Sequence, residues 1–326
     1  MRPAFSVLFL TTLIGVGQGL LVALVTAQFF LVIGADGAGE TGGFYALGSV
    51  LALILLGLGL LASFFHLANP GRAWRSAAKW RTSWLSREVI LIPAVCGLAF
   101  LYALVHWLGW SPVLLVFDNG KALDLPMALG FAAAGASLAL FVCTGMIYAC
   151  VRFVRQWASA WTVVNYLMMG LASGFTLAAA YAALSGSALR DFLTVAALAL
   201  TLLAMATRLY QVRRNGRVRL KSTLKTAIGS HHPQIRQISQ GFMGQSFNTT
   251  EFFTPGAAET IRGLTLFFTL AGFVVPAILL AASLGGDYGL LMVAAALCQY
   301  AGLLAERWVF FAAGNHVQNL YYQARA

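Results

Sequence analysis

The chain has 326 residues, of which 60% are hydrophobic and 10% are charged, and its mean hydropathy is +0.80. Soluble globular proteins carry about 25% charged residues, so this composition excludes a soluble protein and indicates an integral membrane protein. The formal net charge of +11 would suit a nucleic-acid partner, but the cations stand in loops beside apolar segments, as membrane topology requires. We therefore expect no nucleic-acid binding.

Apolar segments of membrane-spanning length recur along the whole chain. A helix crosses the hydrocarbon core with about 20 apolar residues. Eight segments meet this length: Phe5–Ile33, Phe44–Leu67, Val89–Gly109, Pro126–Ala149, Tyr166–Leu184, Phe192–Tyr210, Gly263–Leu284 and Gly289–Phe311. We expect an all-α integral membrane protein, with eight transmembrane helices in one bundle that forms a single domain over residues 1–326.

The loops between these segments alternate in charge. Ala68–Arg87 holds five cations and no acid, Cys150–Ala160 holds two arginines, and Gln211–Arg262 holds eight cations against two acids. The alternate loops are short and carry most of the remaining acids. The positive-inside rule then predicts that both termini and the three basic loops face the cytoplasm of a bacterium, with the chain in its inner membrane.

The stretch FHLANPGRAW, residues 65–74, follows the second segment and opens the first basic loop. Asn69 and Pro70 predict the N-cap and first residue of a short helix. Arg72, Arg75 and Lys79 are spaced to share one face of that helix. A basic helix lying along the headgroups is typical of an anionic-lipid anchor, and we assign Arg75 and Lys79 to lipid headgroups.

His66 precedes this helix, and the next apolar helix opens at Ser86, a suitable N-cap, with Glu88 in its first turn. Because the loop is short, His66, Arg72, Ser86 and Glu88 are candidates to converge on one site. A group that exchanges protons near pH 7 beside an apolar cleft is what quinone chemistry requires. A structural role remains open, because histidines at helix ends are commonly hydrogen-bond partners and Glu88 is explained equally by capping.

Two further ionisable residues, Glu306 and Arg307, fall inside the last apolar segment. Charges within a membrane span are candidates for a functional site, so both join the quinone-site candidates. Pairing with each other, or extension of the side chains to the interface, would account for them equally well. With no carboxylate near the middle of a span, the sequence does not favour a proton pump.

Four segments of the chain together carry a resemblance to a known family. HLANPGRAWRSAAKWRTSWLSRE, RPAFSVLFLTTLIGVGQG, CTGMIYACVRFVRQW and HHPQIRQISQGFMGQSFNTTEFF resemble the membrane anchor subunit of dimethyl sulfoxide reductase-type molybdoenzymes. The resemblance implies an eight-helix anchor that is not itself catalytic. It also implies an iron–sulfur subunit and a molybdopterin catalytic subunit as partners on the cytoplasmic side, and exchange of electrons with menaquinone or ubiquinone.

The resemblance places the quinone-site histidine of the family on His66. The GFMGQSFNTTEFF segment and the Arg-Gln-Trp loop are more similar to the variant that serves cytoplasmic sulfite dehydrogenase than to the anchor of a respiratory sulfoxide reductase. We therefore expect electrons from sulfite oxidation to reach the quinone. The alternative is an anchor that takes electrons from quinol for a dimethyl sulfoxide or related reductase.

No haem or metal is expected in this chain. The five histidines are not placed for two of them to share a helix face at one depth, as a haem with two histidine ligands would need. The four cysteines show no CxxC spacing. The sequence leaves the direction of electron flow, the kind of quinone and dimerisation open.

The loop 211–262 is too long for a simple connection and is the predicted docking segment for partner subunits. Its second half is nearly uncharged and aromatic, which favours a docking surface; an aromatic patch dipping into the membrane interface is the alternative. The docking candidates are Gly241, Phe242, Gly244, Phe247, Asn248, Phe252 and Phe253. Two other function classes stay open: a membrane transporter, and an anchor without a quinone site.

Overall fold

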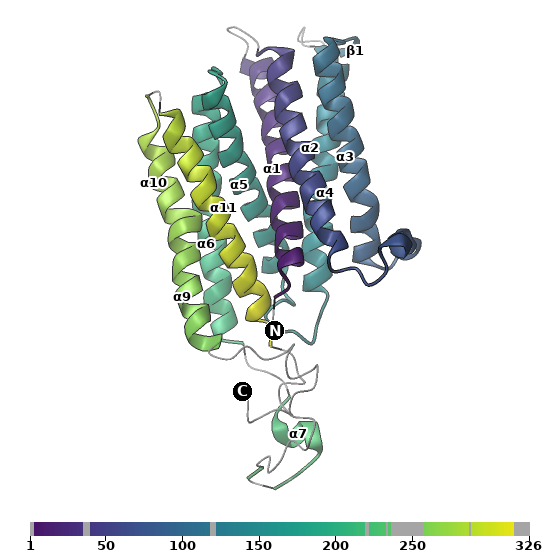
Figure 1. The fold of residues 1–326 in the computed structure, drawn as a ribbon, viewed down its shortest axis with the longest axis vertical. Coiled ribbons are helices and arrows are strands. Elements are labelled where there is room, and N and C mark those ends of the chain that lie inside the picture. The colour runs from purple at the N-terminus through teal and green to yellow at the C-terminus, as the bar shows by residue number, and fades with distance from the viewer. Residues whose placement is uncertain are drawn as a thin grey trace.

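The computed structural model describes residues 3–34, 40–117, 122–218, 222–232, 234–235, 257–286 and 288–315. Within them, eight helical spans are long and apolar enough to cross a membrane, and they stand side by side in one bundle (Figure 1). Seven are single helices: α1 (Phe5–Gly34), α2 (Gly42–Phe64), α3 (Trp84–Leu108), α4 (Leu125–Ala149), α5 (Ala160–Leu184), α6 (Arg190–Gly216) and α11 (Gly289–Ala312). The predicted multi-pass helical protein is confirmed.

The seventh span consists of three consecutive pieces. Helix α9 (Ala257–Thr269) passes into a π-helical turn, η2 (Leu270–Val274), and continues as α10 (Val275–Ala282). Pro276 has no N–H to donate to the carbonyl of Gly272 four residues earlier, which explains the change of winding. The Gly272 oxygen instead accepts a hydrogen bond from Gln299 Nε2 of α11 at 3.3 Å.

Helix α1 lies at the centre and packs against α2, α4, α5 and α11. Its crossing with α5 is a contact between backbones. A Cβ added at Gly19 would lie 2.1 Å from the oxygen of Gly170, and one at Gly174 would lie 2.1 Å from the carbonyl carbon of Gly19. Small residues permit such close approach of membrane helices, so the three glycines set the spacing between α1 and α5.

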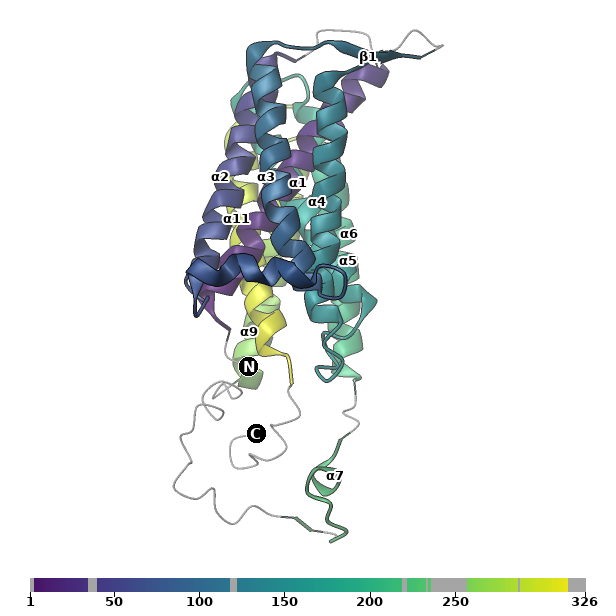
Figure 2. The ribbon, with the colours of Figure 1, turned by 90° about the vertical axis from the view of Figure 1, so that its right-hand side faces the viewer.

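The start of α1, the end of α11, the loop after α2 and the α4–α5 connection share one end of the bundle, here called the basic end (Figures 1 and 2). The short helix predicted after His66 is present there as a 3₁₀ helix, η1 (Pro70–Lys79), which lies across the foot of α3 (Figure 2). Pro70 occupies the first turn as predicted, whereas the Asn69 side chain makes no capping bond. With three residues per turn, Arg72 and Arg75 are in line, but Lys79 is not, and the predicted single face is wrong.

Helix boundaries differ from the predictions at two places beside η1, the end of α2 and the start of α3. Helix α2 ends at Phe64, so His66 lies in the turn after it. Helix α3 begins at Trp84 with Ser83 as N-cap, whose hydroxyl accepts from the Ser86 amide at 3.3 Å. Ser86 is therefore not the cap, and Glu88 is not in the first turn.

The predicted loop 211–262 is shorter than expected at both ends. Helix α6 continues to Gly216, because Gln211 is buried inside the bundle and Arg213 and Arg214 stand in the last turn, where the helix dipole favours cations. Helix α9 starts at Ala257 with Glu259 in its first turn. Between them the structure describes one short helix, α7 (Leu224–Ile228).

The opposite end carries an element that the all-α prediction missed. Strands β1 (Val113–Val116) and β2 (Ala122–Asp124) form an antiparallel pair between α3 and α4. The second strand leads directly into α4, where Asp124 Oδ1 accepts from the Met127 amide at 2.9 Å as the N-cap. The sequence analysis had placed this segment in a loop between two predicted spans.

Candidate functional site

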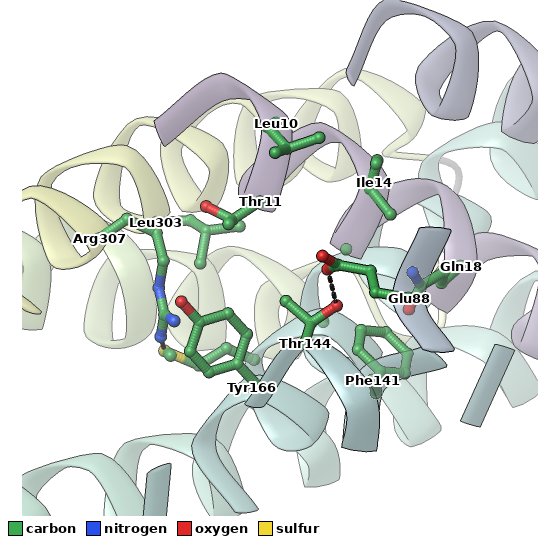
Figure 3. Close-up of a pocket in the computed structure, with 13 residues that line it drawn as sticks. Leu10, Thr11, Ile14, Gln18, Glu88, Phe141, Thr144, Tyr166, Leu303 and Arg307 are labelled. Atoms are coloured by element: carbon green, nitrogen blue, oxygen red, sulfur yellow. Dashed lines mark hydrogen bonds between the residues drawn. The ribbon is translucent and has the colours of Figure 1, made fainter. Parts of the chain in front are cut away.

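A small cavity lies inside the bundle within about two helical turns of the basic end. It is enclosed by α1, α3, α4, α5 and α11, and we call it the polar cavity (Figure 3). Its polar lining residues are Thr11, Gln18, Glu88, Thr144, Tyr166 and Arg307. About 20 Å³ is open to the centre of a water molecule, which is room for about one water and far too little for a quinone ring.

Glu88 projects from α3 into the polar cavity. Its Oε1 accepts a hydrogen bond of 2.5 Å from the Thr144 hydroxyl of α4. Figure 3 shows the carboxyl group on one wall and the Arg307 guanidinium on the other, with Tyr166 between them. Among the described residues Glu88 makes no ion pair. The carboxyl is thus held in place by one neutral donor and otherwise faces the cavity.

The opposite wall of the cavity is backed by three buried charges, here called the charge cluster: Arg208 of α6 with Glu306 and Arg307 of α11. Arg208 Nε lies 2.6 Å from Glu306 Oε1, and Arg307 Nε lies 2.5 Å from Glu306 Oε2. The three side chains are 1–3% exposed. The Arg307 guanidinium also stacks on the Tyr166 ring at 4.0 Å. The sequence predicted Glu306 and Arg307 as site residues but missed Arg208.

A seven-residue spacing in two helices is the signal that would have revealed Arg208. Helix α6 presents Thr194, Thr201 and Arg208, and α11 presents Met292, Gln299 and Glu306. Each member of the first set contacts its counterpart in the second: Thr194 with Met292 at 3.8 Å, Gln299 with Thr201 at 3.0 Å, and Arg208 with Glu306 at 2.6 Å. The two helices run in the same direction, so a constant offset pairs the residues that bridge them.

A second opening, here called the apolar groove, lies between α1 and α2 at the basic end. Ser6, Phe9, Leu13, Leu58, Leu61, Ala62 and Phe65 line it, and its volume is about 380 Å³. This volume is within the range of about 300–1,000 Å³ that small-molecule sites occupy. His66 follows the lining residue Phe65 directly in the chain and is exposed. Its partial burial lowers the pKa of His66 below the ordinary value of 6.5.

The polar cavity and the apolar groove lie at the same depth on two sides of α1. A Cβ at Gly59 of α2 would meet Ile14 at 2.6 Å and the Leu10 oxygen at 3.3 Å. Leu10 and Ile14 of α1 line the cavity. Leu58 and Leu61, which flank Gly59 on α2, line the groove. One helix diameter of about 10–12 Å therefore separates the two spaces.

Comparison with known proteins identifies the family. The family of the DMSO reductase anchor subunit (DmsC) matches residues 2–313. The chain is also 49% identical to a sulfite dehydrogenase subunit of Allochromatium vinosum over 326 residues, which cover 100% of both sequences. The chain belongs to the DMSO reductase anchor subunit family. The resemblance stated from the sequence is confirmed, and the relative agrees with the sulfite dehydrogenase variant.

The anchor does not bring all the predicted quinone-site residues together. Glu88 and Arg307 line the polar cavity and Glu306 pairs with Arg307 behind its wall, but His66 and Arg72 are exposed and do not line it. Ser86 is buried, and its hydroxyl donates to the Ser76 carbonyl, which ties η1 to α3. The expected convergence of His66 and Arg72 with Ser86 and Glu88 is therefore not observed.

The remaining predicted residues lie on the surface of the anchor or outside the described part. Arg75 and Lys79 are exposed on η1, and the Arg75 guanidinium lies 5.5 Å from the Trp74 ring. The docking candidates, from Gly241 to Phe253, lie outside the described residues. Within the described ranges, no group of three or more His, Cys, Asp or Glu residues is arranged to hold a metal ion.

Proposed function

We propose that this anchor subunit holds an iron–sulfur subunit and a molybdopterin catalytic subunit on the bacterial inner membrane and transfers their electrons to the quinone pool. The full-length similarity to a subunit of a sulfite dehydrogenase supports sulfite as the source of the electrons. The anchor itself performs no substrate chemistry in this account. It supplies a membrane attachment, a docking surface and a quinone site.

The partners dock at the basic end, which faces the cytoplasm. The positive-inside rule supports this orientation, because Ala68–Arg87 and the connection between α6 and α9 hold most of the loop cations. That connection, which includes the aromatic segment from Gly241 to Phe253, is the longest stretch of sequence between two spans, and we assign the docking to it. The loops at the opposite end are short.

In this proposal the apolar groove next to Phe65 and His66 is the quinone site. The presence of this groove at the basic end is the main observation in support of the proposal. Its lining is apolar apart from Ser6, which suits an isoprenoid tail, and one lining residue, Phe65, directly precedes His66 in the chain. A site at the surface of the basic end lies next to the docked iron–sulfur subunit and to water. Electrons and protons therefore reach the headgroup without crossing the membrane.

His66 is suited to bind the headgroup in its neutral form. Its lowered pKa leaves the imidazole unprotonated at pH 7, so one ring nitrogen can donate a hydrogen bond to a quinone oxygen and the other remains available to exchange a proton. Arg72, exposed on η1 and six residues after His66 in the chain, adds a positive charge at the basic end. Bound quinone supplies the two-electron, two-proton chemistry.

The test is a His66→Leu variant in the assembled complex. The substitution preserves apolar volume at an exposed turn, so assembly should be normal, whereas quinone-linked turnover should fall at least tenfold. Turnover with a soluble artificial acceptor, which bypasses the anchor, should persist. The same change at His232, an exposed histidine at the same end, is the matched control. Wild-type quinone turnover in His66→Leu would contradict the site.

An anchor that takes electrons from quinol for a dimethyl sulfoxide or related reductase is the second candidate, and the matching family favours it. The two candidates share the anchor, the site and the orientation and differ in the direction of electron flow. Sulfite-dependent quinone reduction by the isolated complex supports the first. Quinol-dependent sulfoxide reduction without sulfite activity supports the second.

A further inference from the structure

The strands β1 and β2, here called the strand pair, expose apolar side chains on both of their faces. All four residues of β1 are apolar, and their side chains are 49–70% exposed. Leu115 and Val116 pair with consecutive residues of β2, so their side chains point to opposite faces of the pair. A short apolar sheet with two open faces and two open edges is unfavourable in water and prone to association. A partner that covers it is therefore expected.

The strand pair lies at the level of a membrane surface. Helix α3, which leads to β1, has 25 residues and is about 38 Å long at 1.5 Å per residue. The hydrocarbon core of a bilayer is about 30 Å thick, and the headgroup regions extend it to about 40–45 Å. The end of α3 therefore reaches the headgroups. Beyond it, β1 runs roughly at right angles to the helices, along the end of the bundle (Figure 2).

The exposed apolar surface of α3 continues onto the strand pair. Leu104 and Leu108 are exposed on α3, and Trp107 and Trp110 are exposed where the helix ends. Tryptophan is enriched where a membrane meets water. The sequence from residue 107 to residue 117 contains no Asp, Glu, Lys or Arg. The surface that faces lipid along the span thus passes onto β1 without a charged break.

The exposure of both faces favours lipid over a docked protein as the partner. A protein that covers the face of Val116 would leave Leu115 in water, whereas lipid surrounds a thin element on all sides. The backbone limits the depth, because the outer edge of each strand of a two-stranded sheet has unpaired N–H and C=O groups. Such groups are not tolerated in the hydrocarbon core. The strand pair therefore suits the boundary between acyl chains and headgroups, where water reaches its edges.

We propose that the strand pair binds a lipid surface. It lies in the boundary between acyl chains and headgroups of the leaflet away from the basic end, and its apolar side chains hold the connection between α3 and α4 at that depth. The proposal goes beyond the proposed function. It depends neither on the quinone site nor on the partner subunits.

The short helix η1 at the other end of α3 gives the proposal its lipid specificity. Both elements lie across an end of α3 (Figure 2) and have exposed tryptophans beside them. Helix η1 carries Arg72, Arg75 and Lys79, which attract anionic headgroups, whereas neither β1 nor β2 contains a cation. The strand pair should therefore bind by apolar contact alone, with no preference for anionic lipid.

The test is photo-crosslinking of the assembled complex in nanodiscs of phosphatidylcholine. The photoreactive residue p-benzoylphenylalanine replaces Leu115 in one variant and Val116 in another. Mass spectrometry should find lipid adducts in both variants, in yields comparable to those of the same change at Leu101, an exposed position on α3. Addition of anionic phosphatidylglycerol should leave the yields unchanged. Adducts at Leu101 but at neither strand position would place the strand pair in water and overturn the proposal.

The same variants in native membranes test a protein partner. A cross-link from Leu115 or Val116 to another protein, in place of lipid, would overturn the proposal in favour of a docking surface. A second change tests whether the apolar side chains hold the strand pair in place. With the photoreactive residue at Leu115, Val116→Asp should lower the lipid-adduct yield severalfold, and Val116→Thr, which keeps the branched shape, should lower it less. An unchanged yield in Val116→Asp would show that the helices alone set the depth, which contradicts the anchoring role.

Discussion

The two spaces on either side of α1 at the basic end differ in polarity and in size. On one side, five helices enclose a polar cavity backed by buried ion pairs, with room for about one water. On the other, two helices form an open apolar groove of about 380 Å³. The first space cannot admit an organic ligand and the second has few polar groups. The comparison separates a space beside buried charges from an apolar space that, in the proposed function, binds the quinone.

The largest effect is expected from breaking the charge cluster. Glu306→Gln removes the carboxylate shared by Arg208 and Arg307 and leaves two buried cations together. Loss of one partner of a buried ion pair costs about 3–5 kcal/mol. The free energy of unfolding in detergent should fall by that amount and assembly should fail.

The exposed pair Arg190–Asp191 at the other end supplies the control. Asp191→Asn should change stability by no more than about 1 kcal/mol. Similar losses of unfolding free energy in the two variants would show that the charge cluster contributes no more to stability than a surface ion pair.

The cavity side should also be intolerant of added volume. Gly174→Ala places a Cβ 2.1 Å from the carbonyl carbon of Gly19, which forces α5 away from α1. Overpacking of this kind costs about 1–3 kcal/mol, measurable as a lowered midpoint of thermal unfolding. Gly57→Ala on α2, where a Cβ has no neighbour within 4 Å, should leave stability unchanged or raise it. Equal stability of the two variants would refute the close crossing.

The groove side should accept added volume but lose ligand affinity. Leu58→Trp fills part of the groove from a position that is 48% exposed, so folding should be normal. The apparent quinone affinity should fall about tenfold, the lower range for a changed apolar pocket, with soluble-acceptor turnover unaffected. Leu60→Trp, on the same helix outside the groove, should bind quinone normally. A loss of affinity in both variants would argue against the groove.

The smallest effect is expected at the surface of the basic end. Changing Arg75 and Lys79 together to Gln removes two exposed cations from η1, each worth about 1 kcal/mol of attraction to an anionic membrane. Retention of η1 at vesicles that contain anionic lipid should weaken, with quinone affinity near wild type. Arg75→Lys combined with Lys79→Gln keeps one of the two charges and should restore part of the retention that the double Gln variant loses. A selective loss of quinone turnover would place these residues in the quinone site.

The number and order of the spans could be predicted from the sequence because each span is a long apolar run, and length and composition decide membrane insertion. The ends of the helices were less predictable. Helix α6 runs to Gly216 because Gln211 bonds to Asn165 and Arg208 inside the bundle. Ser83 rather than Ser86 caps α3 because Ser86 bonds to η1.

Only some residues of the candidate site could be predicted from the sequence. Glu306 and Arg307 stood out because charges are rare in apolar segments, and Glu88 because it follows Ser86 at the start of a span. That Glu88 and Arg307 face one cavity depends on how five helices pack. Gln18, Thr144 and Tyr166 are ordinary residues for a membrane helix and have no local signal. Arg208 had one, the seven-residue spacing it shares with Thr194 and Thr201, which becomes informative only when compared with the same spacing in α11.

The most direct test of the account is to locate the quinone. A photoactivatable azido-quinone can be bound to the assembled complex in membranes, and labelled peptides can then be identified by mass spectrometry with and without excess natural quinone. The account predicts competed labelling of Ser6–Leu13 and Leu58–His66, the two walls of the groove, and its loss in Leu58→Trp. Competed labelling confined to the opposite end, around Tyr102–Trp110, would contradict it.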